Sequence, residues 1–345
     1  MHKNWLLILM RKCMRHLLVL LVSFSFLSLV NTVLANDAHK QFVQMQNLAN
    51  QGHIRSIFLL GMMFDLGLGT EINKQKAIKY LEIASNAGDR DAQFNLGMIY
   101  LYGSENEKNI KKGILLITQA AEQGDPYAQY NLGVIFSSGQ YVIKDYEQAV
   151  SWYKKSANNG FAKAQFSLGS AYEQGFGTKQ NYEQAVLWYM KAANQNIAEA
   201  QYNLAKAYET GKGIRQDFSQ AVELYKQAAQ QGLSSAQYNL ASLYFEGVGV
   251  KRDYEQGAKL YLQAAEKGLI KAQFNIGTIY FTGQGMPKDY ERAIYWLKLA
   301  ADNGDIQAQA NLGYMYENGL GVEKDPIFAK KLYQKALDQG LIEIK

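Results

Sequence analysis

Residues 268–303 read GLIKAQFNIGTIYFTGQGMPKDYERAIYWLKLAADN, and near-copies of this stretch fill most of the 345-residue chain. Eight copies follow one another without an insertion. A fixed period in this range predicts a stack of small helical units, because one such unit cannot bury a core by itself. The predicted repeats are residues 52–87, 88–123, 124–159, 160–195, 196–231, 232–267, 268–303 and 304–339.

Within one copy, the pattern predicts two helices joined by a turn. Residues 270–281 carry small or apolar side chains at the i, i+4, i+7 spacing of an amphipathic helix. Gly283 and Gly285 then end this helix, because glycine readily takes the left-handed conformation that closes a last turn. Asp289 begins the second helix as its N-cap.

The positions that this geometry constrains recur from copy to copy. Where the opening glycine is replaced, the residue is Asn196, which also tolerates the left-handed conformation. In four copies a Gln follows the N-cap at the spacing of a capping box: Gln148, Gln184, Gln220 and Gln256. The N-cap position always carries Asn or Asp: Asn73, Asn109, Asp145, Asn181, Asp217, Asp253, Asp289 and Asp325.

Small side chains recur at one position of the first helix. Because a helix-interior glycine costs about 0.5–1 kcal/mol relative to alanine, this recurrence predicts a close crossing of two helices. The position carries Gly61, Gly97, Gly133, Gly169, Ala205, Ala241, Gly277 and Gly313.

The pattern A-x-x-L-G-x-x-Y, G-x-G, D-Y-x-x-A-x-x-W-Y-x-x-A-A resembles the Sel-1-like repeat, a relative of the tetratricopeptide repeat. The resemblance covers residues 52–339, and residues 160–195 carry it through Leu168, Gly169, Tyr172, Gly175, Gly177, Tyr182, Ala185, Trp188, Tyr189, Ala192 and Ala193. It implies an all-α, right-handed superhelical α/α solenoid whose first helices line a concave groove. It also implies a non-catalytic scaffold or adaptor that binds a protein or peptide along this concave face.

Residues 1–35 have the pattern of a secretory signal peptide. Basic residues precede an apolar run at 17–30, and Val33-Leu34-Ala35 offers a small-residue cleavage site. This run is short for a transmembrane helix. We therefore expect cleavage near Ala35, a periplasmic or secreted location and no stable membrane insertion afterwards; an uncleaved membrane anchor is the alternative. Residues 36–51 then form an N-terminal capping helix with Asp37 as its N-cap, and residues 340–345 form a C-terminal tail.

The charge of the chain depends on this segment. It contains four basic residues and no acidic ones, so its removal lowers Lys plus Arg from 36 to 32 against 31 Asp plus Glu. The net charge falls from +5 to +1, and no nucleic-acid-binding footprint remains. We expect a monomer that binds no nucleic acid.

Groups able to carry catalysis are sparse. Cys13 lies inside the signal peptide, and of four histidines only His39 and His53 remain after cleavage. Ser151 and Lys154 match the S-x-x-K spacing of serine β-lactamases, but the accompanying motifs are missing. We therefore expect no enzyme activity, no cofactor and no metal site. The alternatives are a penicillin-binding or β-lactamase-like cell-wall-active protein and a secreted host-interaction factor for virulence or entry.

Two rows of side chains on the first helices are candidates for partner binding. The aromatic row would supply apolar anchors along the groove, or its rings would pack between adjacent first helices. It comprises Phe58, Phe94, Tyr130, Phe166, Tyr202, Tyr238 and Phe274. The asparagine row would hydrogen-bond an extended peptide backbone, or it would tie neighbouring repeats together. It comprises Asn95, Asn131, Asn203, Asn239, Asn275 and Asn311.

Overall fold

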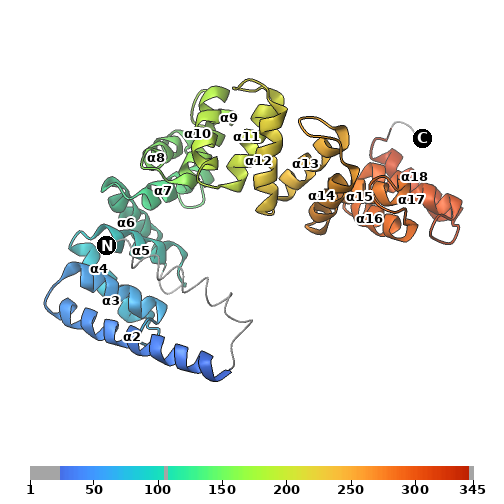
Figure 1. Ribbon diagram of the computed structural model, residues 1–345. Coiled ribbons are helices and arrows are strands. Elements are labelled where there is room, and N and C mark those ends of the chain that lie inside the picture. Colours follow the sequence, from blue (N-terminus) through green and yellow to red (C-terminus); the bar gives the residue numbers. More distant parts are fainter. Residues whose placement is uncertain (1–23, 105–107, 342–345) are drawn as a thin grey trace. The chain divides into compact units, whose positions relative to one another are not determined.

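The computed structural model describes residues 24–104 and 108–341, with side chains from residue 37 onwards (Figure 1). Within these ranges every regular element is a helix, and each repeat folds as a pair of helices. This confirms the predicted all-α solenoid of tandem repeats. By packing, the chain divides into two compact parts, Met1–Leu132 and Gly133–Lys345.

The helix bounds follow the predicted period. The first helices of the repeats are α3 (Ile54–Leu66), α5 (Arg90–Tyr102), α7 (Pro126–Ser138), α9 (Ala162–Gln174), α11 (Ala198–Thr210), α13 (Ser234–Glu246), α15 (Ile270–Thr282) and α17 (Ile306–Asn318). The second helices are α4 (Lys74–Asn86), α6 (Ile110–Glu122), α8 (Tyr146–Asn158), α10 (Tyr182–Ala193), α12 (Phe218–Gln230), α14 (Tyr254–Glu266), α16 (Tyr290–Asp302) and α18 (Pro326–Asp338).

Each second helix begins at the predicted N-cap residue. The Asp217 carboxylate, for example, accepts a hydrogen bond from the Gln220 backbone N–H at 3.0 Å. The expected capping-box role of the following Gln is not seen, because the N-cap N–H already has another acceptor. In Asp217 this N–H donates to the Tyr208 carbonyl of the first helix at 2.9 Å. The same backbone bond recurs in the other repeats and fixes the turn between the two helices.

The turn itself depends on glycine for two different reasons. Gly175 ends α9 in the left-handed conformation, with φ at 77°. Gly177 is also left-handed, and a Cβ atom added there would lie 2.0 Å from the Tyr146 carbonyl oxygen of the preceding repeat. The second repeat, which lacks the second turn glycine, differs, because Gly103 adopts an extended conformation instead. Among the described non-glycine residues, Asn196 alone has a positive φ, as predicted.

The predicted helix crossing lies at the small residues of the first helix. A Cβ atom on Gly169 would lie 2.7 Å from the Tyr189 ring of α10. At Gly277 it would lie 2.8 Å from the Leu297 side chain of α16. The core therefore consists of alanines and glycines at the contacts between backbones, filled between them by larger apolar side chains such as Leu168.

The N-terminal helix α2 (Phe24–Asn50) packs on α3 (Figure 1). It buries Phe42 and Ala49 against the first repeat, as a capping helix should. It begins earlier than expected, so Asp37 lies inside the helix and is not its N-cap. Residues 1–23 of the expected signal peptide and residues 342–345 of the expected tail lie outside the described residues. Within the described residues, no helix combines the length and the apolar character that crossing a membrane requires.

Candidate functional site

The aromatic row lies on the first helices but is largely covered. Phe58 is buried and only 3% exposed, and the other six rings are half-buried. In the C-terminal part Phe166, Tyr202 and Tyr238 contact tyrosines on the second helix of their own repeat. The centroid distances are 5.9 Å for Phe166–Tyr189 and 5.7 Å for Tyr202–Tyr225. Phe94 in the N-terminal part instead contacts Tyr127 on the first helix of the next repeat, with centroids 6.4 Å apart. The rings are therefore engaged both within and between repeats.

In the C-terminal part the asparagine row lies against tyrosines of the preceding repeat. Asn239 on α13 donates to the hydroxyl of Tyr225 on α12 at 2.9 Å, which joins the sixth repeat to the fifth. Asn203 and Asn275 occupy the corresponding positions beside Tyr189 and Tyr261, and each partly offsets the increase in the pKa of that phenol. These contacts support the alternative role of tying repeats together.

In the N-terminal part the asparagine row behaves differently. Asn95 and Asn131 donate to backbone carbonyls four residues earlier in their own helices, at 2.7 and 2.8 Å.

A row of buried tyrosines on the second helices was not singled out from the sequence, yet it organises these contacts. The Tyr225 hydroxyl donates to Glu209 on the first helix of its repeat at 2.5 Å and accepts from Asn239 of the next repeat. Tyr189 makes the corresponding 2.5 Å bond to Glu173. Burial raises the pKa of both hydroxyls well above the ordinary value, and the bonds to Glu173 and Glu209 add to the increase.

We name this arrangement the Glu–Tyr–Asn junction. It is formed by Glu209, Tyr225 and Asn239, and the corresponding residues of the repeat before are Glu173, Tyr189 and Asn203, of which Tyr189 donates to Glu173.

A row of buried glutamines also escaped sequence reasoning. Gln165 donates to the Ala157 carbonyl of the preceding repeat at 3.3 Å and accepts from Gln195 of its own repeat at 2.9 Å. Each member of the row is at most 6% exposed. The available signal was the recurrence of a polar residue directly after the buried alanine of the first helix. The row comprises Gln93, Gln129, Gln165, Gln201, Gln237, Gln273 and Gln309.

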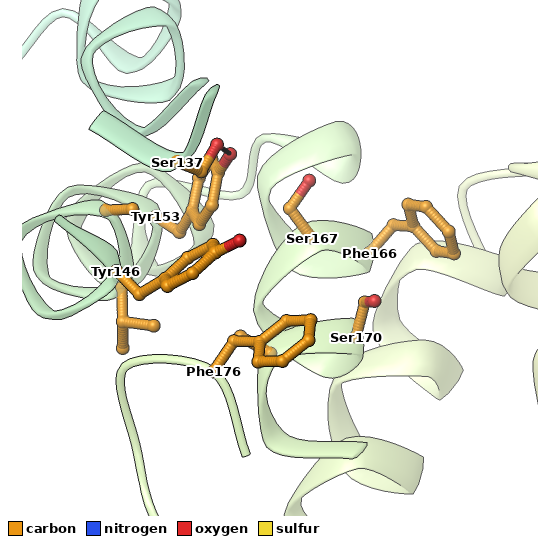
Figure 2. Close-up of a pocket in the computed structure, with 10 residues that line it drawn as sticks. Ser137, Tyr146, Tyr153, Phe166, Ser167, Ser170 and Phe176 are labelled. Carbon is orange, nitrogen blue, oxygen red and sulfur yellow. Dashed lines mark hydrogen bonds between the residues drawn. The ribbon is translucent and has the colours of Figure 1, made fainter. Parts of the chain in front are cut away.

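Two pockets occupy the same position of the repeat. The Met62 pocket, in the N-terminal part, has a volume of about 330 Å³ and includes Met62, Met98, Tyr102 and the Asp65–Lys74 ion pair, whose atoms lie 2.7 Å apart. The Ser167 pocket, in the C-terminal part, has a volume of about 190 Å³ (Figure 2). Six lining positions of the two pockets correspond at a distance of 72 residues, which is two repeats. The Met62 pocket has Asp65, Lys74, Ile78, Asn95, Met98 and Ile99 at these positions, and the Ser167 pocket has, in the same order, Ser137, Tyr146, Val150, Ser167, Ser170 and Ala171.

The residues considered for catalysis lie apart from both pockets. Ser151 and Lys154 are exposed on α8 and line neither pocket. His39 donates through Nδ1 to the Gly69 carbonyl at 2.9 Å and so ties α2 to the first turn. His53 is exposed at the start of α3. The described residues contain no group of three His, Cys, Asp or Glu side chains that could hold a metal ion.

Comparisons with known proteins agree on the repeat. The family model for the Sel1 repeat matches residues 54–89, 90–125, 126–161, 162–197, 198–233, 234–269, 270–305 and 306–341. A comparison with curated protein sequences finds no match.

Two solved structures are similar over 87% of this chain at 30% identity. One is a protective antigen of uropathogenic Escherichia coli strains with an SLR fold, at a TM-score of 0.83. The other is a Sel1 repeat protein from Oxalobacter formigenes, at a TM-score of 0.66. The similarity covers 64% of the antigen, so this chain spans less than two thirds of its length, and 86% of the Oxalobacter protein.

Proposed function

Because this chain belongs to the Sel1 repeat family, whose members are generally protein-interaction scaffolds, we propose that it is a non-catalytic scaffold that binds a segment of another protein. The family membership confirms the resemblance predicted from the repeat pattern. The bound segment would be a peptide or an extended stretch of a protein, held by several modest contacts on a surface that the stack orders in advance.

This proposal rests on one observation: the side chains that line the pocket differ between repeats, whereas the residues that hold the repeats in place stay the same. N-caps and buried glutamines recur along the chain, whereas the pocket position carries unlike side chains. The Met62 pocket presents thioethers beside an ion pair, and the Ser167 pocket presents hydroxyls and rings. A repeat whose backbone geometry is constant, and whose surface pocket carries different side chains from one repeat to another, is suited to selecting a partner.

We further propose that the protein works outside the cytoplasm, after cleavage near Ala35. The support is the order of basic, apolar and small residues in residues 1–35. A secreted host-interaction role is the second candidate. It is favoured by the 30% identity to the protective antigen of uropathogenic Escherichia coli strains.

The test is chemical crosslinking of the purified chain without residues 1–35 to periplasmic and culture-supernatant proteins, read by mass spectrometry. We expect a specific partner whose recovery falls in Met98→Glu, which places a charge in the Met62 pocket. Recovery should persist in the charge-matched control Gln119→Glu, at an exposed position of α6. Circular dichroism would verify that both variants are folded.

Two outcomes would contradict the proposal. One is the absence of any partner beyond those captured by an unrelated exported protein. The other is nitrocefin hydrolysis that disappears in Ser151→Ala, because this would make the chain an enzyme of the β-lactamase kind.

A further inference from the structure

The Ser167 pocket lies where a Glu–Tyr–Asn junction would otherwise stand. Tyr153 on α8 is the counterpart of Tyr189 and Tyr225. The position 16 residues before each tyrosine is Glu173 or Glu209 in the complete junctions, but it is Ser137 here. The position 14 residues after it is an asparagine in the complete junctions, but it is Ser167 here. Two long polar side chains are thus replaced by short ones, and a pocket remains between α7, α8 and α9.

A third substitution changes the chemistry of the opening. In the next repeat Lys212 lies over the Tyr182 ring at 5.5 Å. The counterpart of that pair is Phe176 stacked on Tyr146, with centroids 5.0 Å apart and an angle of 17° between the rings. Both rings are partly exposed, Tyr146 at 36% and Phe176 at 47%. The rim of the pocket therefore carries a pair of stacked rings where its neighbour carries Lys212, and Lys144 lies over the Tyr146 ring at 5.6 Å.

The lining of the pocket sets the class of group that it can hold. No lining residue is charged, and Lys144 lies over the Tyr146 ring at the rim, so an ionised group inside the pocket would lose its hydration without a charged partner in the lining. Figure 2 shows the rings of Tyr146 and Phe176 and, above Tyr146 in this view, the hydroxyls of Ser137 and Tyr153, which lie 3.0 Å apart. Ser167 lies on the facing helix. Aromatic faces favour stacking with another ring, and each hydroxyl can both donate and accept a hydrogen bond.

The volume of the pocket limits the size of the group that it can bind. Sites for whole small molecules usually measure about 300–1,000 Å³, and a cavity of about 150 Å³ already accepts benzene. A pocket of about 190 Å³ therefore suits a single six-membered ring. We propose that the Ser167 pocket binds the phenol side chain of a tyrosine presented by the partner segment. This inference rests on the proposed scaffold function and names the residue type that one subsite selects.

The test uses p-cresol, the side-chain analogue of tyrosine, with the chain lacking residues 1–35 and saturation-transfer NMR as the readout. We expect saturable binding of p-cresol. The variant Ser137→Glu/Ser167→Asn, which restores the side chains of the complete junctions, should weaken binding about tenfold or more, because the added atoms fill the pocket. Ser167→Asn alone is the milder version, should the double variant fold poorly. Ser151→Ala, at an exposed position of α8, should bind as the wild type does.

Three results would overturn the pocket assignment. These are no saturable binding of p-cresol, equal binding by wild type and by folded Ser137→Glu/Ser167→Asn, and binding of N-acetylglucosamine in place of p-cresol, which would make the site a sugar site. This readout needs no partner, so it separates the two proposals. A chain that binds p-cresol but captures no protein refutes the scaffold function alone. A chain whose partner capture survives while p-cresol fails refutes the pocket alone.

Discussion

At the scale of single residues, buried glutamines and tyrosines join one repeat to the next by hydrogen bonds. Gln165 spans two repeats because its amide can donate and accept at the same time. A buried amide group is costly when one side has no partner. In the described residues, the Oε1 atoms of Gln237, Gln273 and Gln309 are buried and accept no hydrogen bond. The hydrogen bonds of the glutamine row are therefore complete on both sides of the amide only in part of the chain.

The variant Lys267→Gln should stabilise the protein. Lys267 donates to the Gly232 carbonyl, whereas its counterpart Gln195 donates both to the Gly160 carbonyl and to Gln165 Oε1. Glutamine at position 267 can keep the first bond and supply the missing donor to Gln237. We expect a gain of about 1 kcal/mol in the free energy of unfolding, measured by urea denaturation. No gain relative to Lys251→Gln, at an exposed position, would contradict this.

The buried tyrosines should make the stability fall at alkaline pH. Their pKa is raised in the folded chain, so the phenols stay protonated there after those of the unfolded chain, near pH 10, have ionised. The stability that they contribute is fully present below about pH 10 and is lost as the pH rises towards their folded pKa. The same sign holds for Tyr333, where burial and the bond to Glu317 raise the pKa to about 12.

Tyr225→Phe tests this dependence. It should lower the free energy of unfolding at pH 8 by about 1–3 kcal/mol, because Glu209 and Asn239 lose their shared partner. It should also make the fall in stability above pH 10 shallower than in wild type. Denaturation midpoints at several pH values would measure both effects. The control Tyr295→Phe, at a 58% exposed position, should change neither.

At the scale of helices and turns, sequence reasoning succeeded where the cause is local. An N-cap such as Asp217 acts on an N–H three residues away, and Asn196 takes its conformation from its own backbone preference. The expected capping boxes were wrong for a non-local reason. The N-cap N–H is bonded to a carbonyl of the other helix, such as Tyr208, and the spacing of residues along one helix cannot reveal this.

Gly177→Ala should cost more than Gly175→Ala, although both positions have a positive φ. An added Cβ on Gly175 approaches Gln180 to 3.3 Å, whereas on Gly177 it meets the Tyr146 carbonyl at 2.0 Å. Both variants pay about 1 kcal/mol or more for the backbone conformation, and we expect Gly177→Ala to lose about 1–3 kcal/mol more because two repeats must separate. Thermal and urea unfolding would measure the difference. Equal losses would mean that the turn does not couple the repeats.

At the scale of the whole molecule, the fold was predictable because a period of 36 residues admits few architectures. For the candidate site, the sequence predicted only that an aromatic row and an asparagine row lie on the first helices. Whether Asn203 faces a peptide or Tyr189 depends on which helices pack together, and that contact joins different repeats. The aromatic row stays a prediction as a binding surface, although rings such as Phe166 and Tyr202 are engaged within their own repeats. The Ser167 pocket arises from three substitutions that look like drift when each is read alone.

Export should produce a chain that begins at Asn36. The pattern of residues 1–35 predicts removal after Ala35 by a signal peptidase. N-terminal sequencing of the protein recovered from periplasm or medium would check the cleavage site, with Ala35→Leu expected to slow processing. A full-length chain retained in the membrane fraction would favour the anchor instead.

The incomplete glutamine row has a consequence for the order in which the array opens. Its three unsatisfied acceptors fall in consecutive repeats, the sixth to the eighth, whereas the amides of Gln165 and Gln201 in the fourth and fifth are engaged on both sides. Repeats open in cooperative blocks whose free energies follow their interfaces. Amide hydrogen exchange should therefore be faster in α13–α18 than in α9–α12, so that the C-terminal repeats detach as one block while the fourth and fifth still hold.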